Sequence, residues 1–545
     1  MPATSSGVRH TRGSAPSRAP AGYWCPLLHA HLPYVRHPEQ PHFLEEDWLF
    51  EAITETYVPL IAALDALVAD GVEYRLTLTL SPTLLSMLSD PLLLARYRDY
   101  LDRLIALADS EVARTRREPA TQKLARAYRD EFRNVQRIYR ETYGSDLLEA
   151  FRRHQATGRL AILTSSATHA FLPLLDPVPA AVRAQIAVGA ETTRRLMGRA
   201  TPGLWLPECA YHPGQEPFLK EAGIGYSFLE AHGLTDAHPR PTRGVYAPIV
   251  SRSGIVFFGR DHESSRQVWS AEVGYPGDPV YREFYRDIGW DLPLPYLQEF
   301  LRDGLRRNLG IKYHRVTGRV SLGDKAAYER DLALARADEH AADFVRHRQE
   351  QVKAAAARLD RPPIVVSPYD AELFGHWWYE GPRFLESVFR RLALQDEVLA
   401  VTPIEYLERH PDCEVAQPPL SSWGAKGYAD VWLNPTNDWI YSHIDVAAER
   451  MVELVQRFGS PSALQDRALR QAARELMLAQ ASDWPFIMTT GTAVEYAKRR
   501  IRDHVARFTY LYDGLLGNGP LDEATLADFE GRDNLFPDLD YRLYQ

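Results

Sequence analysis

Short runs of apolar residues alternate with longer stretches of helical periodicity through the first half of the chain. Most of these runs are continuously apolar, which is typical of strands buried on both faces of a parallel sheet. The runs interpreted as strands are Trp24–Leu32, Tyr74–Leu80, Leu160–Ser165, Leu204–Pro207, Tyr226–Leu229 and, later, Ile364–Ser367. The pattern therefore predicts an α/β protein built on a parallel sheet.

Several of these predicted strands end in polar or titratable side chains. His29 and His31 close the first strand, Glu208 follows the fourth, and Asp370 follows the last. In βα barrels the chemistry lies at the C-terminal ends of the strands. An open doubly wound sheet is the alternative, but no glycine-rich phosphate loop follows the first strand. We therefore expect a barrel-type domain with its functional site at this end.

Three segments depart from the alternation of strands and helices. Residues 83–158 are charged, rich in arginine and helically periodic, which predicts a helical insertion within a barrel domain spanning residues 23–414. An aromatic, glycine-containing stretch then leads into a C-terminal helical domain, residues 415–545. Three helices are expected there, near residues 440–458, 463–481 and 490–516. Residues 1–22 are rich in Ser, Arg, Pro and Ala, which predicts a disordered tail.

Composition narrows the class of protein. Among the 545 residues, 45% are hydrophobic and 25% charged, the balance of a globular protein rather than a disordered one. The net charge of −9 argues against a non-specific nucleic-acid binder, which would be basic. Cys25, Cys209 and Cys413 are too few and too scattered for a disulfide framework or a zinc ribbon. Without an apolar run of about 18 residues or a signal-peptide core, we expect no membrane span and a cytoplasmic location.

The tryptophans favour a carbohydrate-binding cleft. Eight of the eleven lie beside Gly, Pro, His or acidic residues rather than in regular apolar stripes: Trp48, Trp205, Trp269, Trp377, Trp378, Trp423, Trp432 and Trp484. Most tryptophans in proteins belong to the core. In polar surroundings, however, their flat faces suit stacking on the C–H surfaces of sugars.

Two carboxylates at strand ends suit glycoside chemistry. Glu208 follows Pro207 in GLWLPECAYHP, and Asp370 ends the apolar run of IVVSPYDAELFGHWWYEGP. In a retaining glycosidase one carboxylate attacks the anomeric carbon while the other protonates the leaving oxygen. Either acid alone could instead be a helix N-cap or part of a buried salt bridge. Both together, among tryptophans, favour catalysis.

The pattern His29-Ala-His31 allows two interpretations. With a later Asp the pair could bind zinc, as in metal-dependent carbohydrate deacetylases. Alternatively, the histidines could donate hydrogen bonds to sugar hydroxyls beside the carboxylates. Neither an H-E-x-x-H motif nor a cysteine cluster supports a metal. We therefore expect no metal, and we keep the deacetylase as the less favoured alternative.

The chain resembles glycoside hydrolase family 57 and, within it, the glucan branching enzymes. The resemblance runs from about residue 23 to beyond residue 505 and includes HAHLPYVRH, EEDWLFEAITETYVPL, TSSATHAFLPLL, LWLPECAY, RQVWSAEVGYPGD, SPYDAELFGHWWYEG, SSWGAKGYADVW and ASDWPFIMTTGTAVEYAKRR. It implies a distorted (β/α)7 barrel with a helical insertion and a C-terminal helical domain. It also implies that Glu208 is the catalytic nucleophile and Asp370 the general acid/base.

The same resemblance implies further site residues and a reaction. Arg260, Gly277, Trp423 and Asp483 match substrate-contact positions. Residues that match the lining of the donor and acceptor subsites are His29, His31, His169, Trp48, Trp269 and Trp432. The implied reaction cleaves an α-1,4 bond of a glucan, holds the chain on Glu208, and transfers it to a 6-hydroxyl. It requires no cofactor, nucleic acid or membrane.

One departure from the family leaves alternatives open. Family members carry a long mobile loop with a tyrosine over the cleft, whereas the matching stretch here, Glu230–Val245, is short and has no tyrosine. Such a lid would exclude water from the covalent intermediate. A hydrolase or a 4-α-glucanotransferase of the same family is therefore the main alternative, and a catalytically idle glucan-binding module is a further one.

Overall fold

Seven parallel strands close into a ring at the centre of the protein. The structure, a computed structural model, describes residues 19–270 and 273–545. One sheet has the order β4-β3-β2-β1-β8, in which all neighbours are parallel. Its strands are β1 (Gly22–Ala30), β2 (Leu76–Leu80), β3 (Leu160–Ser165), β4 (Leu204–Trp205) and β8 (Ile364–Asp370). The short β9 (Val398–Ala400) pairs with the first residues of β1.

A second sheet completes the ring. Here β5 (Tyr226–Leu229) pairs in parallel with β7 (Val256–Gly259), while β6 (Ile249–Val250) and β10 (Glu414–Val415) extend its outer edge. Single parallel bridges, Gly203 to Tyr226 and Arg260 to Val366, join the two sheets. The ring β1-β2-β3-β4-β5-β7-β8 is thus closed but weakly paired at two seams, which agrees with the distorted (β/α)7 barrel that was predicted.

The barrel interior follows the two-residue period of a strand. Tyr23, Cys25 and Leu27 of β1 point into an inner cluster with Trp205 and Phe258. The intervening residues of β1 pack outward against the surrounding helices. The same period directs the last residues of the inward series, His29 of β1 and Asp370 of β8, into the mouth of the barrel.

Three predicted strands end at different residues from those expected: the first and the last, described here, and the one before Glu208, described with the site. The first ends at Ala30 because the backbone N–H of His31 leaves the ladder and donates to the Glu372 carboxylate at 3.2 Å. The last continues beyond Ser367 to Asp370, in register with β1. The predicted tail falls on residues 1–18, which lie outside the described residues, while Gly22 already belongs to β1.

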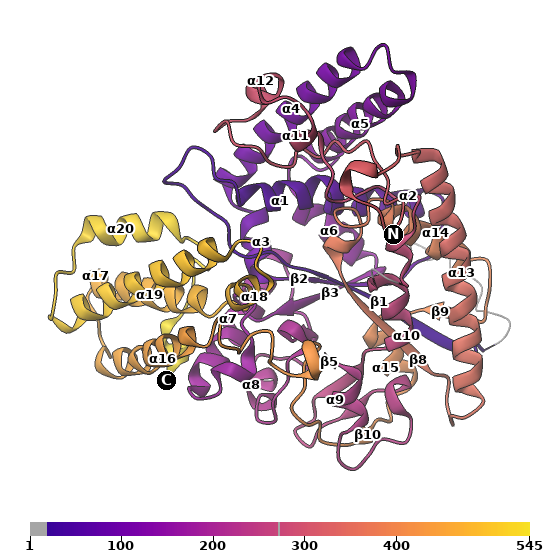
Figure 1. Ribbon diagram of the computed structural model, residues 1–545. Coiled ribbons are helices and arrows are strands. Elements are labelled where there is room, and N and C mark those ends of the chain that lie inside the picture. Colours follow the sequence, from indigo (N-terminus) through magenta and orange to yellow (C-terminus); the bar gives the residue numbers. More distant parts are fainter. Residues whose placement is uncertain (1–18, 271–272) are drawn as a thin grey trace, which may run out of the picture.

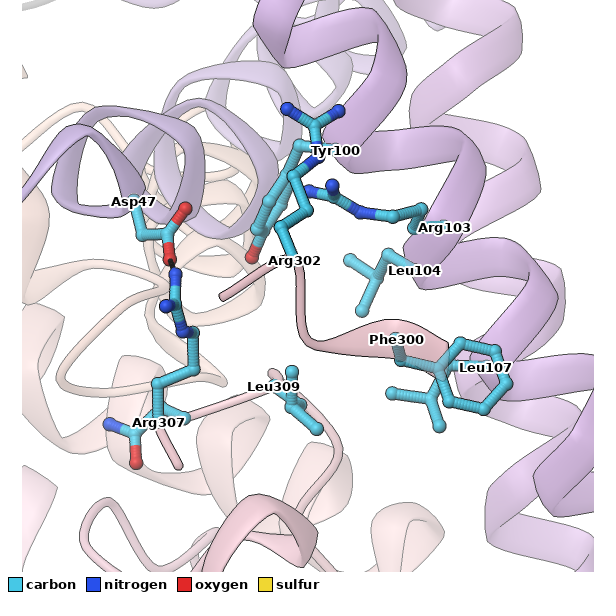
Figure 2. A pocket seen from close by; sticks show the side chains of 10 residues that line it. Asp47, Tyr100, Arg103, Leu104, Leu107, Phe300, Arg302, Arg307 and Leu309 are labelled. Carbon is cyan, nitrogen blue, oxygen red and sulfur yellow. Dashed lines mark hydrogen bonds and ion pairs between the residues drawn. The ribbon is translucent and has the colours of Figure 1, made fainter. Parts of the chain in front are cut away.

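The predicted insertion is helical, and the hairpin of its two long helices, α4 (Pro91–Arg114) and α5 (Pro119–Arg137), lies at the top of Figure 1. Its helices are α3 (Pro82–Leu88), α4 (Pro91–Arg114), α5 (Pro119–Arg137) and α6 (Leu147–Ala156). The α4–α5 hairpin packs on the segment after β7, where Tyr296 and Tyr313 donate hydrogen bonds to the buried carboxylate of Glu111. A pocket of about 30 Å³ remains between α4 and residues 300–309, and Arg307 on its wall pairs with Asp47 at 2.7 Å (Figure 2).

The C-terminal segment forms the predicted helical domain, with five α-helices. These are α16 (Trp439–Arg457), α17 (Ala463–Ala479), α18 (Asp483–Thr490), α19 (Val494–Leu516) and α20 (Glu523–Arg532). The expected helix at 490–516 begins later because α18 ends at Gly491, whose φ of 85° terminates a helix readily. The turn before α18 places Ser482 and Asp483 against the barrel mouth.

No segment apolar enough to span a membrane was expected from the sequence, but one helical run meets that criterion. Residues Glu46–Ala69 contain α1 (Glu46–Ala52) and α2 (Val58–Ala69) and are long and apolar enough by composition to cross a membrane. In the structure, 67% of the most apolar window is buried inside the protein. Side chains such as Phe50 and Leu64 form part of the main core, which accounts for the apolar character of this run.

Candidate active site

Glu208 lies on a strained turn directly after β4. Its backbone has φ of 61° and ψ of 21°, and the following Cys209 has φ of 49°. Non-glycine residues adopt this left-handed conformation only where the surrounding structure holds them, often at functional sites. The turn ends the strand at Trp205, two residues before the predicted Pro207. It also brings the carboxylate of Glu208 to the C-terminal domain.

Two neutral donors hold the carboxylate of Glu208. Trp423 Nε1 donates to Oε2 at 2.8 Å, and Ser482 Oγ donates to Oε1 at 3.0 Å. The backbone N–H of Trp423 also donates to the Glu208 carbonyl at 3.0 Å. With both carboxylate oxygens bonded, the side chain has one orientation, and 13% of it remains exposed. It can therefore meet a substrate while it is held in place.

Asp370, the last residue of β8, shares the barrel mouth with Glu208. The strand register pairs it with His29 of β1. No hydrogen bond to its carboxyl group is found in the described part of the chain, and the charges that lower its pKa come from Arg260 and His31. Unlike Glu208, this carboxyl is free to exchange a proton with a ligand.

The pKa values of both carboxyl groups are raised in this site. Burial, with a smaller contribution from the nearby charge of Asp370, raises the pKa of Glu208 to about 8. Burial also raises the pKa of Asp370 to about 6. Interacting groups titrate as a pair, so near neutral pH the two carboxyls hold one proton between them. A retaining glycosidase needs this condition, because one carboxyl attacks while the other donates a proton.

A third carboxyl group, Glu372, stands behind the pair, and it was not predicted as a site residue. Tyr57 donates its hydroxyl to Glu372 Oε1, which also accepts the His31 backbone N–H. Burial raises the pKa of Glu372 to about 8. The sequence offered one indication of its role, because Glu372 lies two residues after Asp370. In the structure it belongs to a 3-10 turn, Ala371–Leu373, directly after β8.

The three predicted histidines meet at the barrel mouth. His29 Nε2 lies 2.8 Å from His169 Nε2, and the ring of His169 stacks on that of His31 with centroids 3.8 Å apart. Both ring nitrogens of His31 are engaged, Nδ1 with Ser81 at 2.8 Å and Nε2 with Asp483 at 3.1 Å. Both His31 nitrogens and His29 Nε2 therefore bond to neighbouring groups, which disfavours the zinc alternative for this pair.

Two other predicted residues join this cluster. Trp423 caps Glu208, and the guanidinium of Arg260 stacks over its ring at 5.4 Å from the centroid. Arg260 is itself held by Glu230 at 2.9 Å, and its charge also lowers the pKa of Asp370. The structure thus places Trp423 and Arg260, both predicted site residues, beside the carboxyl groups of Glu208 and Asp370.

Four predicted site residues lie elsewhere or are covered. Trp432 is only 2% exposed and packs on Phe171, so it supports the loop after Glu208, and its place in a subsite stays a prediction. Trp48 is half-buried and packs edge-on against Tyr496. Trp269 is half-exposed at the end of α10 (His262–Trp269). Gly277 lies in a 3-10 turn beside Tyr275.

The short segment Glu230–Val245 packs against the loop that carries Trp423. It contains the helix α9 (Ala231–Thr235), whose His232 bonds to the Gly427 carbonyl at 3.1 Å. A Cβ added at Gly233 would lie 2.3 Å from Ser421 Oγ, so the two segments are in close contact. The hydroxyl of Tyr275, in the turn after α10, donates to Asp343. The Trp423 loop is thus the element that covers Glu208 on this side.

Comparisons with known proteins agree along almost the whole chain. The model of glycosyl hydrolase family 57 matches residues 27–419, and the model described as 1,4-alpha-glucan branching enzyme, C-terminal, matches residues 443–544. The chain is 34% identical to the 1,4-alpha-glucan branching enzyme of Thermococcus kodakarensis over 94% of this chain and 77% of that protein.

Solved structures share the fold. The alpha-amylase AmyC of Thermotoga maritima is 43% identical with a TM-score of 0.90, over 96% of this chain and 99% of that chain. The family 57 branching enzyme of Pyrococcus horikoshii is 33% identical with a TM-score of 0.86, over 96% of this chain and 97% of that chain. These similarities confirm the predicted barrel with its C-terminal helical domain.

Proposed function

Because this chain belongs to glycosyl hydrolase family 57, we propose that it is a 1,4-α-glucan branching enzyme. It would cut an α-1,4-linked chain and transfer it to a 6-hydroxyl, forming an α-1,6 branch on a glycogen-like or amylose-like glucan in the cytoplasm. The observation that carries the proposal is the carboxyl pair of Glu208 and Asp370, which holds one proton within a chain that matches branching enzymes over its whole length.

The reaction proceeds by double displacement at Glu208. With both oxygens fixed, this carboxylate attacks the anomeric carbon and forms a glycosyl ester. Asp370, whose carboxyl accepts no competing bond, protonates the leaving glycosidic oxygen. It then takes the proton from the attacking 6-hydroxyl of the acceptor, so the net proton balance is unchanged.

The shared proton must lie on Asp370 when attack begins. The higher pKa of Glu208, about 8 against about 6, places it on Glu208 in the empty site. Arrival of a glycosidic oxygen gives Asp370 a partner for its proton, while the donors Trp423 and Ser482 stabilise the charge on Glu208. Substrate binding therefore moves the proton between the two carboxyls before the bond breaks.

Hydrolysis is the second candidate, and two observations favour it. The alpha-amylase of Thermotoga maritima is 43% identical to this chain, a higher identity than that of either branching enzyme compared above. The segment Glu230–Val245 lacks the tyrosine lid that would exclude water from the intermediate. We therefore expect some hydrolysis beside transfer.

The test is incubation of the purified protein with amylose. Branching produces chain ends that appear only after a debranching enzyme is added, whereas hydrolysis releases reducing ends directly. We expect most ends to require debranching and a smaller share to appear without it. Direct release of all new reducing ends, with no gain after debranching, would assign the protein as a hydrolase.

A further inference from the structure

We propose that Ser482, His169 and His29 form a positioning relay that fixes Glu208 and favours its charged form. The inference rests on the proposed function, because it gives Glu208 the role of nucleophile. None of the three residues needs to touch the reacting atoms. Instead, a line of hydrogen bonds runs from the buried start of the relay in β1 to the carboxylate.

The relay is a continuous series of three short contacts. His29 Nε2 lies 2.8 Å from His169 Nε2, His169 Nδ1 lies 2.9 Å from Ser482 Oγ, and Ser482 Oγ lies 3.0 Å from Glu208 Oε1. The backbone N–H of Ser482 also donates to the His169 carbonyl at 3.1 Å. Four segments distant in the sequence are thus joined at one point, and the C-terminal domain supplies the hydroxyl.

The chemistry of each group determines the direction of the relay. A carboxylate only accepts hydrogen bonds, so the Ser482 hydroxyl must donate to Glu208. The Ser482 oxygen then accepts from His169 Nδ1–H, which leaves His169 Nε2 as the acceptor for His29 Nε2–H. His29 Nδ1 ends the series as a buried nitrogen without a partner in the described part of the chain.

The unpartnered nitrogen at the end makes the two states of the relay unequal. If Glu208 is charged, His29 Nδ1 is an unused acceptor. If Glu208 carries a proton and donates to Ser482, every bond reverses and His29 Nδ1 becomes a buried N–H without an acceptor. Buried N–H groups without a partner are rarer in proteins than under-used acceptors. The relay therefore opposes the effect of burial and favours a charged nucleophile.

Burial and strain both support this arrangement. His29 and His169 are each 3% exposed, and burial lowers the pKa of both well below the ordinary value, so both rings remain neutral as the relay requires. His169 has a φ of 57°, the same left-handed conformation as Glu208. Non-glycine residues in this conformation at both ends of the Ser482 link indicate that the fold enforces the contact.

The charged and titratable groups around Glu208 would set the pH response. They are Asp370 of β8, Asp483 of α18, His29 and His31 at the end of β1, His169 after β3, and Arg260 after β7. None of these is altered when Ser482 is replaced. A shift in the pH profile of a Ser482 variant would therefore report the loss of the hydroxyl donor.

The experiment compares Ser482→Ala with Ser482→Thr, which keeps a hydroxyl. For Ser482→Ala we expect kcat to fall roughly 10- to 100-fold on amylose while KM changes less than about twofold, because a bond to a charged group is lost. We also expect the basic limb of kcat/KM to move to higher pH, because loss of the donor raises the pKa of Glu208, the higher of the two pKa values of the pair. Ser482→Thr should recover part of kcat and return the limb toward its original position.

Two further variants separate this inference from the proposed function. Ser227→Ala removes another fully buried serine hydroxyl, which donates to the Leu204 carbonyl at 2.7 Å, and should leave the pH profile unchanged. Glu208→Gln tests the nucleophile alone. If Ser482→Ala keeps the normal kcat and basic limb while Glu208→Gln is inactive, the relay is wrong and the proposed function stands. If Glu208→Gln is active, Glu208 is not the nucleophile, and the proposed function is wrong whatever the result for Ser482→Ala.

Discussion

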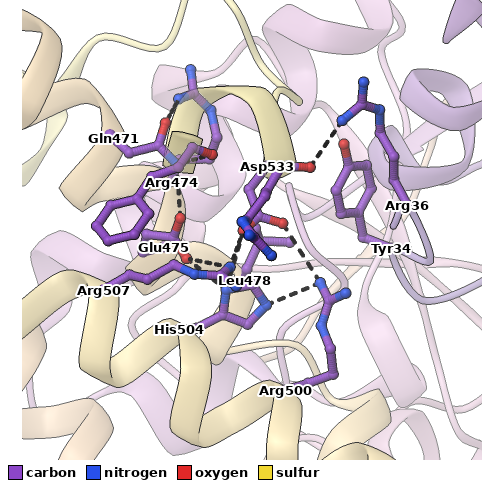
Figure 3. A network of polar contacts seen from close by, with 12 residues as sticks. Tyr34, Arg36, Gln471, Arg474, Glu475, Leu478, Arg500, His504, Arg507 and Asp533 are labelled. Atoms are coloured by element: carbon purple, nitrogen blue, oxygen red, sulfur yellow. Dashed lines mark hydrogen bonds and ion pairs between the residues drawn. The ribbon is translucent and has the colours of Figure 1, made fainter. Parts of the chain in front are cut away.

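Two buried clusters in this protein contain carboxylates and histidines, yet their partners differ. In the C-terminal domain, Glu475, His504 and Asp533 lie within ligand distance of one another, and arginines surround them (Figure 3). Arg507 bonds to Asp533, and Arg500 bonds to His504 at 3.0 Å. At the barrel mouth, by contrast, the hydrogen-bond donors to the Glu208 carboxylate among the described residues are the neutral side chains of Trp423 and Ser482.

The difference separates a structural cluster from a reactive one. The guanidinium group of Arg507 pairs with both Glu475 and Asp533, so these carboxylates hold α17, α19 and the segment after α20 together. Neutral donors orient Glu208 but leave its charge uncompensated. A carboxylate held by neutral donors can attack an electrophile, whereas the charge of an ion-paired carboxylate is stabilised by its cation, which makes it a weaker nucleophile.

Removal of the charged oxygen of Glu208 should have the largest effect. We expect Glu208→Gln to lower kcat on the order of 10⁴-fold or more, because the amide cannot form the glycosyl ester. The thermal midpoint should be unchanged or higher, since burial raises the pKa of the Glu208 carboxyl and thereby costs stability above its ordinary pKa, a cost that the amide does not have. Assays of branching and calorimetry of the same preparation measure both. Near-normal turnover would contradict the assignment.

The same substitution in the structural cluster, Glu475→Gln, should lower stability and leave turnover nearly unchanged. We expect Glu475→Gln to lower the free energy of unfolding by about 3 kcal/mol, because Arg507 and His504 lose their buried partner. Turnover per folded molecule should remain close to normal. Thermal unfolding and active-site titration test this, and a stable but inactive variant would show that the two clusters are not separate in function.

Asp370 should determine one limb of the pH dependence. With the pKa of Asp370 raised to about 6 and that of Glu208 to about 8, the pair holds one proton between these values. Below about pH 6 a second proton binds and blocks attack, and above about pH 8 the last proton is lost and no acid remains. We therefore expect kcat/KM to peak near pH 7. In Asp370→Asn the residual activity should lose its basic limb.

Removal of metal ions should have the smallest effect. Because the ring nitrogens of His31 bond to Ser81 and Asp483, we expect activity on amylose to survive exhaustive chelation. The measurement is turnover before and after dialysis against a strong chelator, with metal analysis of the protein. Stoichiometric zinc, with activity lost on its removal and restored by zinc, would return the deacetylase alternative to first place.

Much of the fold could be predicted from the sequence, because strands buried on both faces are continuously apolar. Leu160–Ser165 and Tyr226–Leu229 have the predicted bounds for this reason. The edge strands β6 and β10 have two residues each and no periodicity to detect. Glu208 and Asp370 were found because both follow apolar strands in the sequence.

The rest of the site depends on contacts between distant segments. Ser482 and Glu208 are 274 positions apart, and a serine next to Asp483 gives no signal of that contact in a single sequence. Trp432 was predicted to contact sugar because polar residues flank it in the sequence, yet in the structure its ring packs against Phe171. Neighbours in the sequence do not reveal which face of a side chain is buried.

The most direct test of the account is to trap the covalent intermediate. Asp370→Asn should react with maltosyl fluoride, since a fluoride leaving group needs no protonation, and it should release the product slowly because the second step lacks its base. Peptide mass spectrometry of the quenched protein should then show one added maltosyl group on the peptide that contains Glu208. Turnover without any adduct, or an adduct on another residue, would contradict the role of Glu208.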